Sequence, residues 1–97
     1  MAIHPALFSS AKNTWATPQY FFDALNRIFH FTLDVCALPA SAKCRRYFTP
    51  AEDGLEQKWA GVCWMNPPYG RQIIGRWMRK AYEEALSGTT VVCLVPS

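Results

Sequence analysis

The segment Asn66-Pro67-Pro68-Tyr69 holds the residues of this sequence that are best suited to chemistry. Two consecutive prolines fix the backbone and remove two N–H donors, so the segment presents mainly acceptors: the Asn66 side-chain oxygen and the Pro67 carbonyl. Tyr69 adds an aromatic face beside them. This combination suits a planar group that carries an NH2, because the acceptors can take its two hydrogens while its ring stacks on the tyrosine.

The chemistry expected of such a site is the activation of an amino nitrogen. Holding both hydrogens out of the ring plane withdraws the nitrogen lone pair from conjugation and makes it nucleophilic. This activation depends on orientation and hydrogen bonding and uses neither a metal nor a strong base. The alternative is structural, because Pro-Pro-Tyr-Gly also forms a rigid turn between a strand and a helix.

The residues around this segment predict a strand, loop, helix and strand in succession. Residues 62–65 form a short apolar run, a helix follows over about 72–86, and residues 89–95 have the pattern of a buried strand. The two strands of such a unit are parallel and are joined by a right-handed crossover. Ligands of open α/β sheets bind at the carboxyl ends of the strands, which is where this loop lies.

The first half of the chain predicts another helix and another strand. Thr17 as N-cap and Pro18 at the first helical position begin an amphipathic helix that ends near Phe29. Residues 31–36 are a short β-prone run, and residues 1–14 are expected to form a loose arm. The apolar helix positions expected to face the core are Phe21, Phe22, Leu25, Ile28, Phe29, Ile73, Ile74, Trp77, Met78, Ala81 and Ala85. The predicted fold class is α/β, a partial Rossmann-like sheet of mainly parallel strands.

Composition limits the classes of protein that fit. The length of 97 residues excludes a two-domain enzyme, and the hydrophobic fraction of 51% excludes a disordered tail. The net charge of +3 permits a polyanionic partner. No apolar run approaches the ~18 residues that span a membrane, and the first residues do not form a secretory signal. The four cysteines lack the spacing of zinc ligands, so we expect reduced thiols, no metal and a cytoplasmic location.

The predicted strand 89–95 has the pattern of a central strand, which requires neighbours on both sides. Residues 37–61 have room for one helical crossover rather than for several strand–helix units. Either the fold is much reduced or the 97 residues are part of a longer protein, and we expect the second. A second chain, in an oligomer, is the other possible source of the missing strands.

Several of these segments together resemble a known family. Asn66-Pro67-Pro68-Tyr69 is similar to the catalytic [DN]-P-P-[YFW] motif of S-adenosylmethionine-dependent amino-methyltransferases. The order of the segments matches that of phage-type DNA N6-adenine methyltransferases; these segments are 15–18, 33–37, 42–44, 53–55, Trp59 and 64–70. The resemblance covers residues 15–97 and implies that they form the N-terminal part of a methyltransferase catalytic domain.

The resemblance implies methyl transfer from S-adenosylmethionine to the N6 amino group of adenine in double-stranded DNA, in a bacterial host cell. The base is expected to be flipped out of the duplex, since stacking hides its amino group. Asn66 and Pro67 are then expected to accept from that amino group, Pro68 to hold the loop and Tyr69 to stack on the base. The implied cofactor-binding residues are Trp15, Thr17, Pro18, Asp34 and Asp53. Arg71, directly after the motif, is a candidate phosphate contact.

Other interpretations of these residues stay open. Asp34 also matches the ribose-binding acidic position of the next strand of such folds, and the loop after it lacks the glycines common in methyltransferases. Lys43, Arg45 and Arg46 either contact phosphate or form a solvated basic loop. The alternative functions are an amino-methyltransferase for a protein glutamine or an RNA base, and an inactive remnant that at most binds cofactor or DNA.

Overall fold

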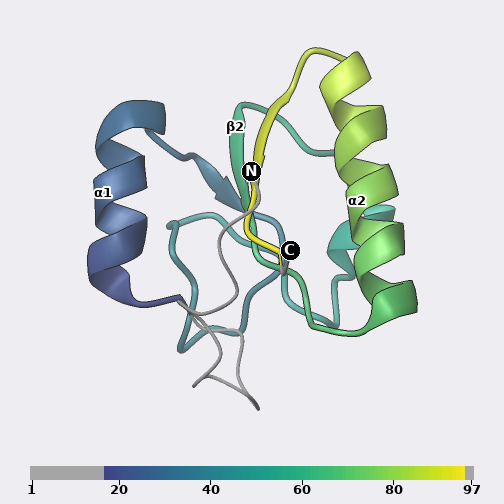
Figure 1. The fold of residues 1–97 in the computed structure, drawn as a ribbon, viewed down its shortest axis with the longest axis horizontal. Helices are drawn as coiled ribbons and strands as arrows, with labels where there is room; N and C mark the ends of the chain where they lie inside the picture. The colour runs from purple at the N-terminus through teal and green to yellow at the C-terminus, as the bar shows by residue number, and fades with distance from the viewer. Residues whose placement is uncertain (1–16, 96–97) are drawn as a thin grey trace.

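The computed structural model describes residues 17–95, which form two α-helices and a small parallel sheet. In chain order the elements are α1 (Gln19–Phe29), β1 (Leu33–Asp34), the 3-10 helix η2 (Gly54–Glu56), β2 (Val62–Met65), α2 (Arg71–Leu86) and β3 (Thr90–Cys93) (Figure 1). Within residues 17–95, neither α-helix has the length and apolar character needed to cross a membrane.

The strands are parallel and lie in the order β1-β2-β3. Cys63 of β2 is opposite Leu33 on one side and Val91 on the other. Beyond β1, Tyr47 forms a further parallel bridge with Asp34, so the chain near Tyr47 extends the sheet at that side. β2 is therefore central, and the loop that follows it starts between the carboxyl ends of two neighbouring strands.

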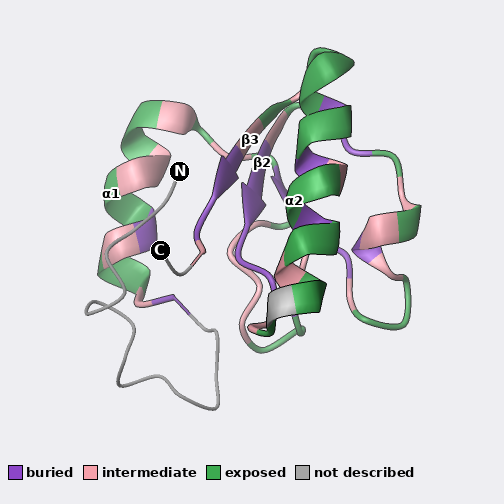
Figure 2. Cartoon of the chain, turned by 45° about the vertical axis from the view of Figure 1, so that its right-hand side comes forward, coloured by how far each residue is buried: buried purple, intermediate pink, exposed green. Residues whose placement is uncertain are grey.

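One helix covers each face of the sheet, so the core has two halves (Figure 1). Cys63 and Met65 are buried on the face of α2, in the same cluster as Trp77. Trp64 is buried on the face of α1, where its ring meets Phe22 edge-on with centroids 5.1 Å apart. Figure 2 shows the buried residues along the strands and on the inner sides of the helices.

A buried carboxylate attaches α2 to the connection between β1 and β2. Glu84 is 5% exposed, and its two oxygens accept from Lys58 Nζ at 3.0 Å, Lys80 Nζ at 2.8 Å and the backbone N–H of Trp59 at 3.3 Å. Burial acts to raise the pKa of Glu84, but the hydrogen bonds from Lys80, Lys58 and Trp59 outweigh it and lower the pKa. The cluster fixes how α2 lies along the sheet.

The predicted fold class and the strand, loop, helix and strand unit are confirmed. The strand over residues 62–65 has the predicted bounds, and α2 begins one residue earlier than predicted, at Arg71. The last strand is shorter than predicted and spans Thr90–Cys93. Among the described residues, the long connection between β1 and β2 contains no α-helix, only the short η2.

The prediction that the apolar stripes of both helices lie entirely in the core is wrong at four positions. These residues are exposed: Ile28, Ile73, Met78 and Ala85. Among the described side chains of α2, Trp77 and Ala81 are buried as predicted, and Glu84, outside the predicted stripe, is buried as well. A sheet of three short strands buries only a narrow strip of each helix, so apolar residues on the flanks stay at the surface.

Candidate active site

The loop from Asn66 to Gly70 leaves the carboxyl end of β2 and leads directly into α2. Asn66 and Pro67 are buried, whereas Pro68 and Tyr69 are half-buried. Burial raises the pKa of the Tyr69 hydroxyl, which therefore stays protonated at neutral pH. Gly70 has a φ of 143°, a conformation that side chains rarely adopt, and this glycine lets the chain turn into the helix.

The side chain of Asn66 is held by a residue that precedes α1. Its Nδ2 donates to the Thr17 Oγ1 at 2.9 Å, and both residues are buried. The prediction that Thr17 caps α1 is wrong. The N-cap is Pro18, whose carbonyl accepts from the N–H groups of Phe21 and Phe22. Thr17 lies one residue before the cap, and this leaves its hydroxyl to bond the Asn66 amide.

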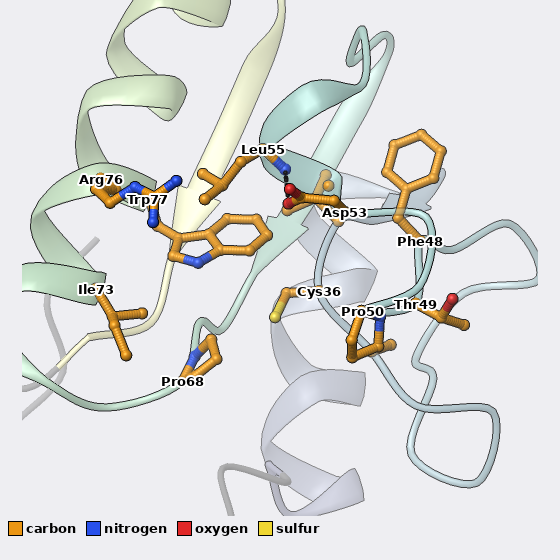
Figure 3. A pocket seen from close by; sticks show the side chains of 13 residues that line it. Cys36, Phe48, Thr49, Pro50, Asp53, Leu55, Pro68, Ile73, Arg76 and Trp77 are labelled. Carbon is orange, nitrogen blue, oxygen red and sulfur yellow. Dashed lines mark hydrogen bonds between the residues drawn. The ribbon is translucent and has the colours of Figure 1, made fainter.

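A cavity of about 320 Å³ lies beside the loop, between the end of β1, the η2 segment and the first half of α2 (Figure 3). Its lining is Val35, Cys36, Ala37, Phe48, Thr49, Pro50, Asp53, Gly54, Leu55, Pro68, Ile73, Arg76 and Trp77. Most of these side chains are apolar, and the charged ones are Asp53 and Arg76. Such a lining suits a flat, partly apolar molecule that carries a few polar groups.

The wall of this cavity at Asp53 has an unusual backbone. Asp53 has a φ of 57°, and its carboxylate accepts from the N–H of Leu55 at 3.1 Å. Gly54 packs so tightly that a Cβ there would lie 2.1 Å from the Val35 carbonyl oxygen and 2.9 Å from the Trp77 ring. The Asp-Gly pair therefore packs against Val35, the residue after β1, and Trp77 of α2, with Asp53 at the cavity.

Asp34 lies elsewhere, at a second cavity of about 10 Å³, roughly the space of one water molecule. Its lining is Thr17, Asp34, Cys36, Ser41, Lys43, Trp64 and Asn66. The Asp34 carboxylate accepts from the backbone N–H of Cys36 at 3.2 Å and of Lys43 at 2.9 Å. Burial raises its pKa from 3.8 to about 6, although these hydrogen bonds oppose the rise.

The structure divides the predicted site residues between the two cavities. Thr17, Asp34 and Asn66 line the small one, whereas Asp53 and Pro68 line the large one. Cys36 lines both, so the two cavities adjoin at this residue. Burial raises the pKa of the Cys36 thiol to about 12, which keeps it protonated and uncharged at neutral pH.

The remaining predicted residues have simpler positions. Pro18 is half-buried at the start of α1. Arg71 is the first residue of α2, and its side chain is outside the described part of the structure. Trp15 also lies outside the described residues. Trp59 and Trp64 belong to the core, since they are 0% and 1% exposed.

Several cavity residues were missed by sequence reasoning. Arg76 was not assigned to the site and Trp77 was assigned only to the core, yet both line the cavity. Arg76 and Trp77 lie three and four residues after Ile73, so all three are on the side of α2 nearest the loop. This helical spacing can be read from the sequence. Phe48 was not identifiable, because its place depends on the pairing of the chain near Tyr47 with β1.

Comparisons with known proteins identify the family of the chain. The family model for DNA N-6-adenine-methyltransferase (Dam) matches residues 5–97. The DNA N-6-adenine-methyltransferase of Haemophilus phage HP1 (strain HP1c1) is 36% identical over 89 residues, 89% of this chain and 51% of the phage protein. YfdM of Escherichia coli (strain K12) is 33% identical over 63 residues, 57% of this chain and 69% of YfdM.

No solved structure matches the chain. The chain spans about half the length of the phage protein. Because the family model covers nearly the whole sequence, the chain belongs to the DNA N-6-adenine-methyltransferase (Dam) family.

Proposed function

We propose that this chain carries the cofactor and base sites of an enzyme that methylates the N6 amino group of adenine in double-stranded DNA. Residues 15–97 are then the N-terminal part of its catalytic domain. The observation that supports this most strongly is the position of the Asn66–Tyr69 motif. It follows the central strand, and its Pro68 lines the same cavity as Asp53.

S-adenosylmethionine is the methyl donor that we assign to the two adjoining cavities. The large cavity has a volume within the range of small-molecule sites, which begins at roughly 300 Å³. Its apolar walls suit a planar base, and Asp53 offers a carboxylate to the amino group of that base. Thr17 and Asp34 lie beyond Cys36 and offer polar groups to the amino-acid end of the donor, and its entry requires this small cavity, with space for about one water molecule, to widen. When bound, S-adenosylmethionine supplies an electrophilic methyl carbon on a positively charged sulfur.

The residues of the motif orient and activate the target amino group. The Asn66 Oδ1 and the Pro67 carbonyl accept its two hydrogens, so the nitrogen lone pair leaves conjugation and can attack the methyl carbon. The bound donor would supply the methyl group to this nitrogen, which would then release one proton to solvent. With the Asn66 Nδ2 donating to the Thr17 hydroxyl, Oδ1 is the end of the amide that accepts.

The base must leave the duplex to reach these acceptors. Tyr69 is half-buried and can stack on an incoming base, whereas Asn66 is only 4% exposed. Binding of the base therefore requires the atoms that cover the Asn66 amide to move. The electrostatics permit a polyanionic partner, since the net charge of the chain is +3.

Transfer of labelled methyl groups tests the proposal. The full chain is incubated with labelled S-adenosylmethionine and either a duplex that contains adenine or a duplex of guanine and cytosine only. We expect label only in the first duplex, as N6-methyladenine, and loss of at least about 100-fold of the rate in Asn66→Ala. Gln72→Ala, at an exposed position of α2, is the matched control. Equal labelling of both duplexes, or full activity of Asn66→Ala, contradicts the proposal.

A further inference from the structure

The segment that follows β1 is a basic loop, residues 35–47, at the edge of the sheet that carries the motif. The sequence has no acidic residue between Asp34 and Glu52, whereas Lys43, Arg45 and Arg46 are close together. Lys43 lines the small cavity with Asn66, and Arg45 and Arg46 are exposed. Positive charge is therefore concentrated next to the site proposed for the target base.

The basic loop is attached to Asp34 at several points. The Asp34 carboxylate accepts from the N–H of Lys43 at 2.9 Å, and the Asp34 backbone N–H donates to the carbonyl of Arg46 at 3.0 Å. The Lys43 ammonium also donates to the side-chain oxygen of Gln19, the first residue of α1, at 3.0 Å. These bonds position the backbone on both sides of Arg45.

The arginines of the basic loop differ from Arg79 and Lys80 of α2. Arg79 pairs with Glu83 at 3.3 Å, and Lys80 pairs with Glu84 at 2.8 Å. No ion pair among the described residues includes Arg45 or Arg46. A guanidinium without an acidic partner is available to an incoming anion, and its planar donor pair matches a phosphate group.

We propose that Arg45 and Arg46 contact backbone phosphates of the DNA strand that delivers its base to Asn66. The inference rests on the proposed function, because it assumes that DNA is the partner. Phosphate contacts fix the register and orientation of a protein on the duplex and carry no sequence information. Asp34 then acts as a positioning residue for the basic loop and does not touch the DNA.

Salt-dependent DNA binding tests this inference. Fluorescence anisotropy of a labelled duplex is measured with the full chain at several salt concentrations. Each phosphate contact contributes about 0.9 to the slope of log affinity against log salt. We expect Arg45→Gln with Arg46→Gln to lower the slope by about 2 in total. Arg45→Lys with Arg46→Lys keeps both charges and should keep most of the slope.

Arg79→Gln is the matched control, since it removes an exposed arginine from α2 and should leave the slope unchanged. A slope that is the same in wild type and the double glutamine variant overturns the inference, and methylation by that variant then shows that the proposed function stands. Failure of the wild type to bind DNA, with cofactor binding intact, overturns both this inference and the DNA part of the proposed function. Circular dichroism verifies that each surface variant is folded.

Discussion

The amide of Asn66 and the hydroxyl of Thr17 are 49 residues apart in the sequence and are hydrogen-bonded at 2.9 Å in a buried position. This bond connects the residue before the cap of α1 to the end of the central strand. It gives Thr17 a role in orienting the acceptor of the motif, in place of the capping role that its sequence position indicates.

Replacing Thr17 with valine should lower methyl transfer about 10- to 100-fold, because the Asn66 amide loses the partner that sets its orientation. The unfolding free energy should fall by about 1–3 kcal/mol, since a buried amide donor is left unsatisfied. Thr17→Ser keeps the hydroxyl and is the matched control. Steady-state kinetics with both variants check this prediction, and equal rates for the valine and serine variants would contradict it.

Gly54 should tolerate no side chain. In Gly54→Ala the new Cβ would collide with the Val35 carbonyl, a backbone atom that cannot move away cheaply. We expect a loss of about 3 kcal/mol or more in unfolding free energy and weaker cofactor binding, because the wall at Asp53 must shift. Chemical denaturation and calorimetric titration measure the two effects.

Gly75→Ala is the matched control for Gly54→Ala. Gly75 is exposed within α2, and a Cβ there meets nothing within 4 Å. The substitution should stabilise the protein by about 0.5–1 kcal/mol, because alanine favours the helix and restricts the unfolded chain. A destabilised Gly75→Ala, or an unaffected Gly54→Ala, would contradict the packing seen in the structure.

The elements near the motif were predictable because local features define them. The apolar run 62–65 ends where Asn66 and two prolines begin, and the helix after it has consistent spacing. The strand β1 is shorter than the predicted run over residues 31–36. Its length is set by pairing with β2, which a local pattern does not reveal. The hydrophobic pattern of a segment was sufficient to predict its structure where that structure depends on the segment itself.

The parts of the site that were not predictable depend on contacts between distant segments. Nothing near Thr17 in the sequence indicates a bond with Asn66, and a capping role is the locally favoured prediction. No local pattern marks Glu84 as buried, yet it is 5% exposed and accepts from two lysines and the Trp59 backbone. Long-range partners decide both positions, and neither leaves a periodic signal in the sequence.

Asp34 should make the stability of the protein depend on pH. Its pKa is raised from 3.8 to about 6, so the folded state binds a proton more tightly than the unfolded state. Its contribution to stability is therefore greatest below about pH 4, declines as the pH rises to about 6 and is constant above that. The expected decline is on the order of 2–3 kcal/mol.

Comparison with Asp34→Asn isolates this contribution from those of the other carboxylates. Denaturation of both proteins is measured from pH 4 to pH 7. The unfolding free energy of Asp34→Asn relative to wild type should rise between pH 4 and 6, whatever its value at pH 4. A difference that stays constant over this range would show that Asp34 is not buried as described.

Glu84→Gln should destabilise the protein by about 2–4 kcal/mol, because three donors lose a charged acceptor in a buried position. The pKa of Glu84 is lowered, so its contribution is present at neutral pH and is lost as the pH falls through that lowered value. Glu83→Gln, which breaks only the exposed pair with Arg79, should cost less than about 1 kcal/mol. Thermal unfolding of both variants at pH 7 provides the comparison, and equal losses would contradict the account of the cluster.

The most direct test of the central claim is an amide NMR titration of the full chain with S-adenosylmethionine. The proposal predicts saturable shifts at Cys36, Asp53, Gly54 and Tyr69, which surround the two cavities and the motif. Amides at the exposed carboxyl half of α2, such as Glu83, should not shift. A spectrum that the cofactor leaves unchanged, or shifts confined to the outer face of α2, would contradict the assignment of a methyl-donor site to these cavities.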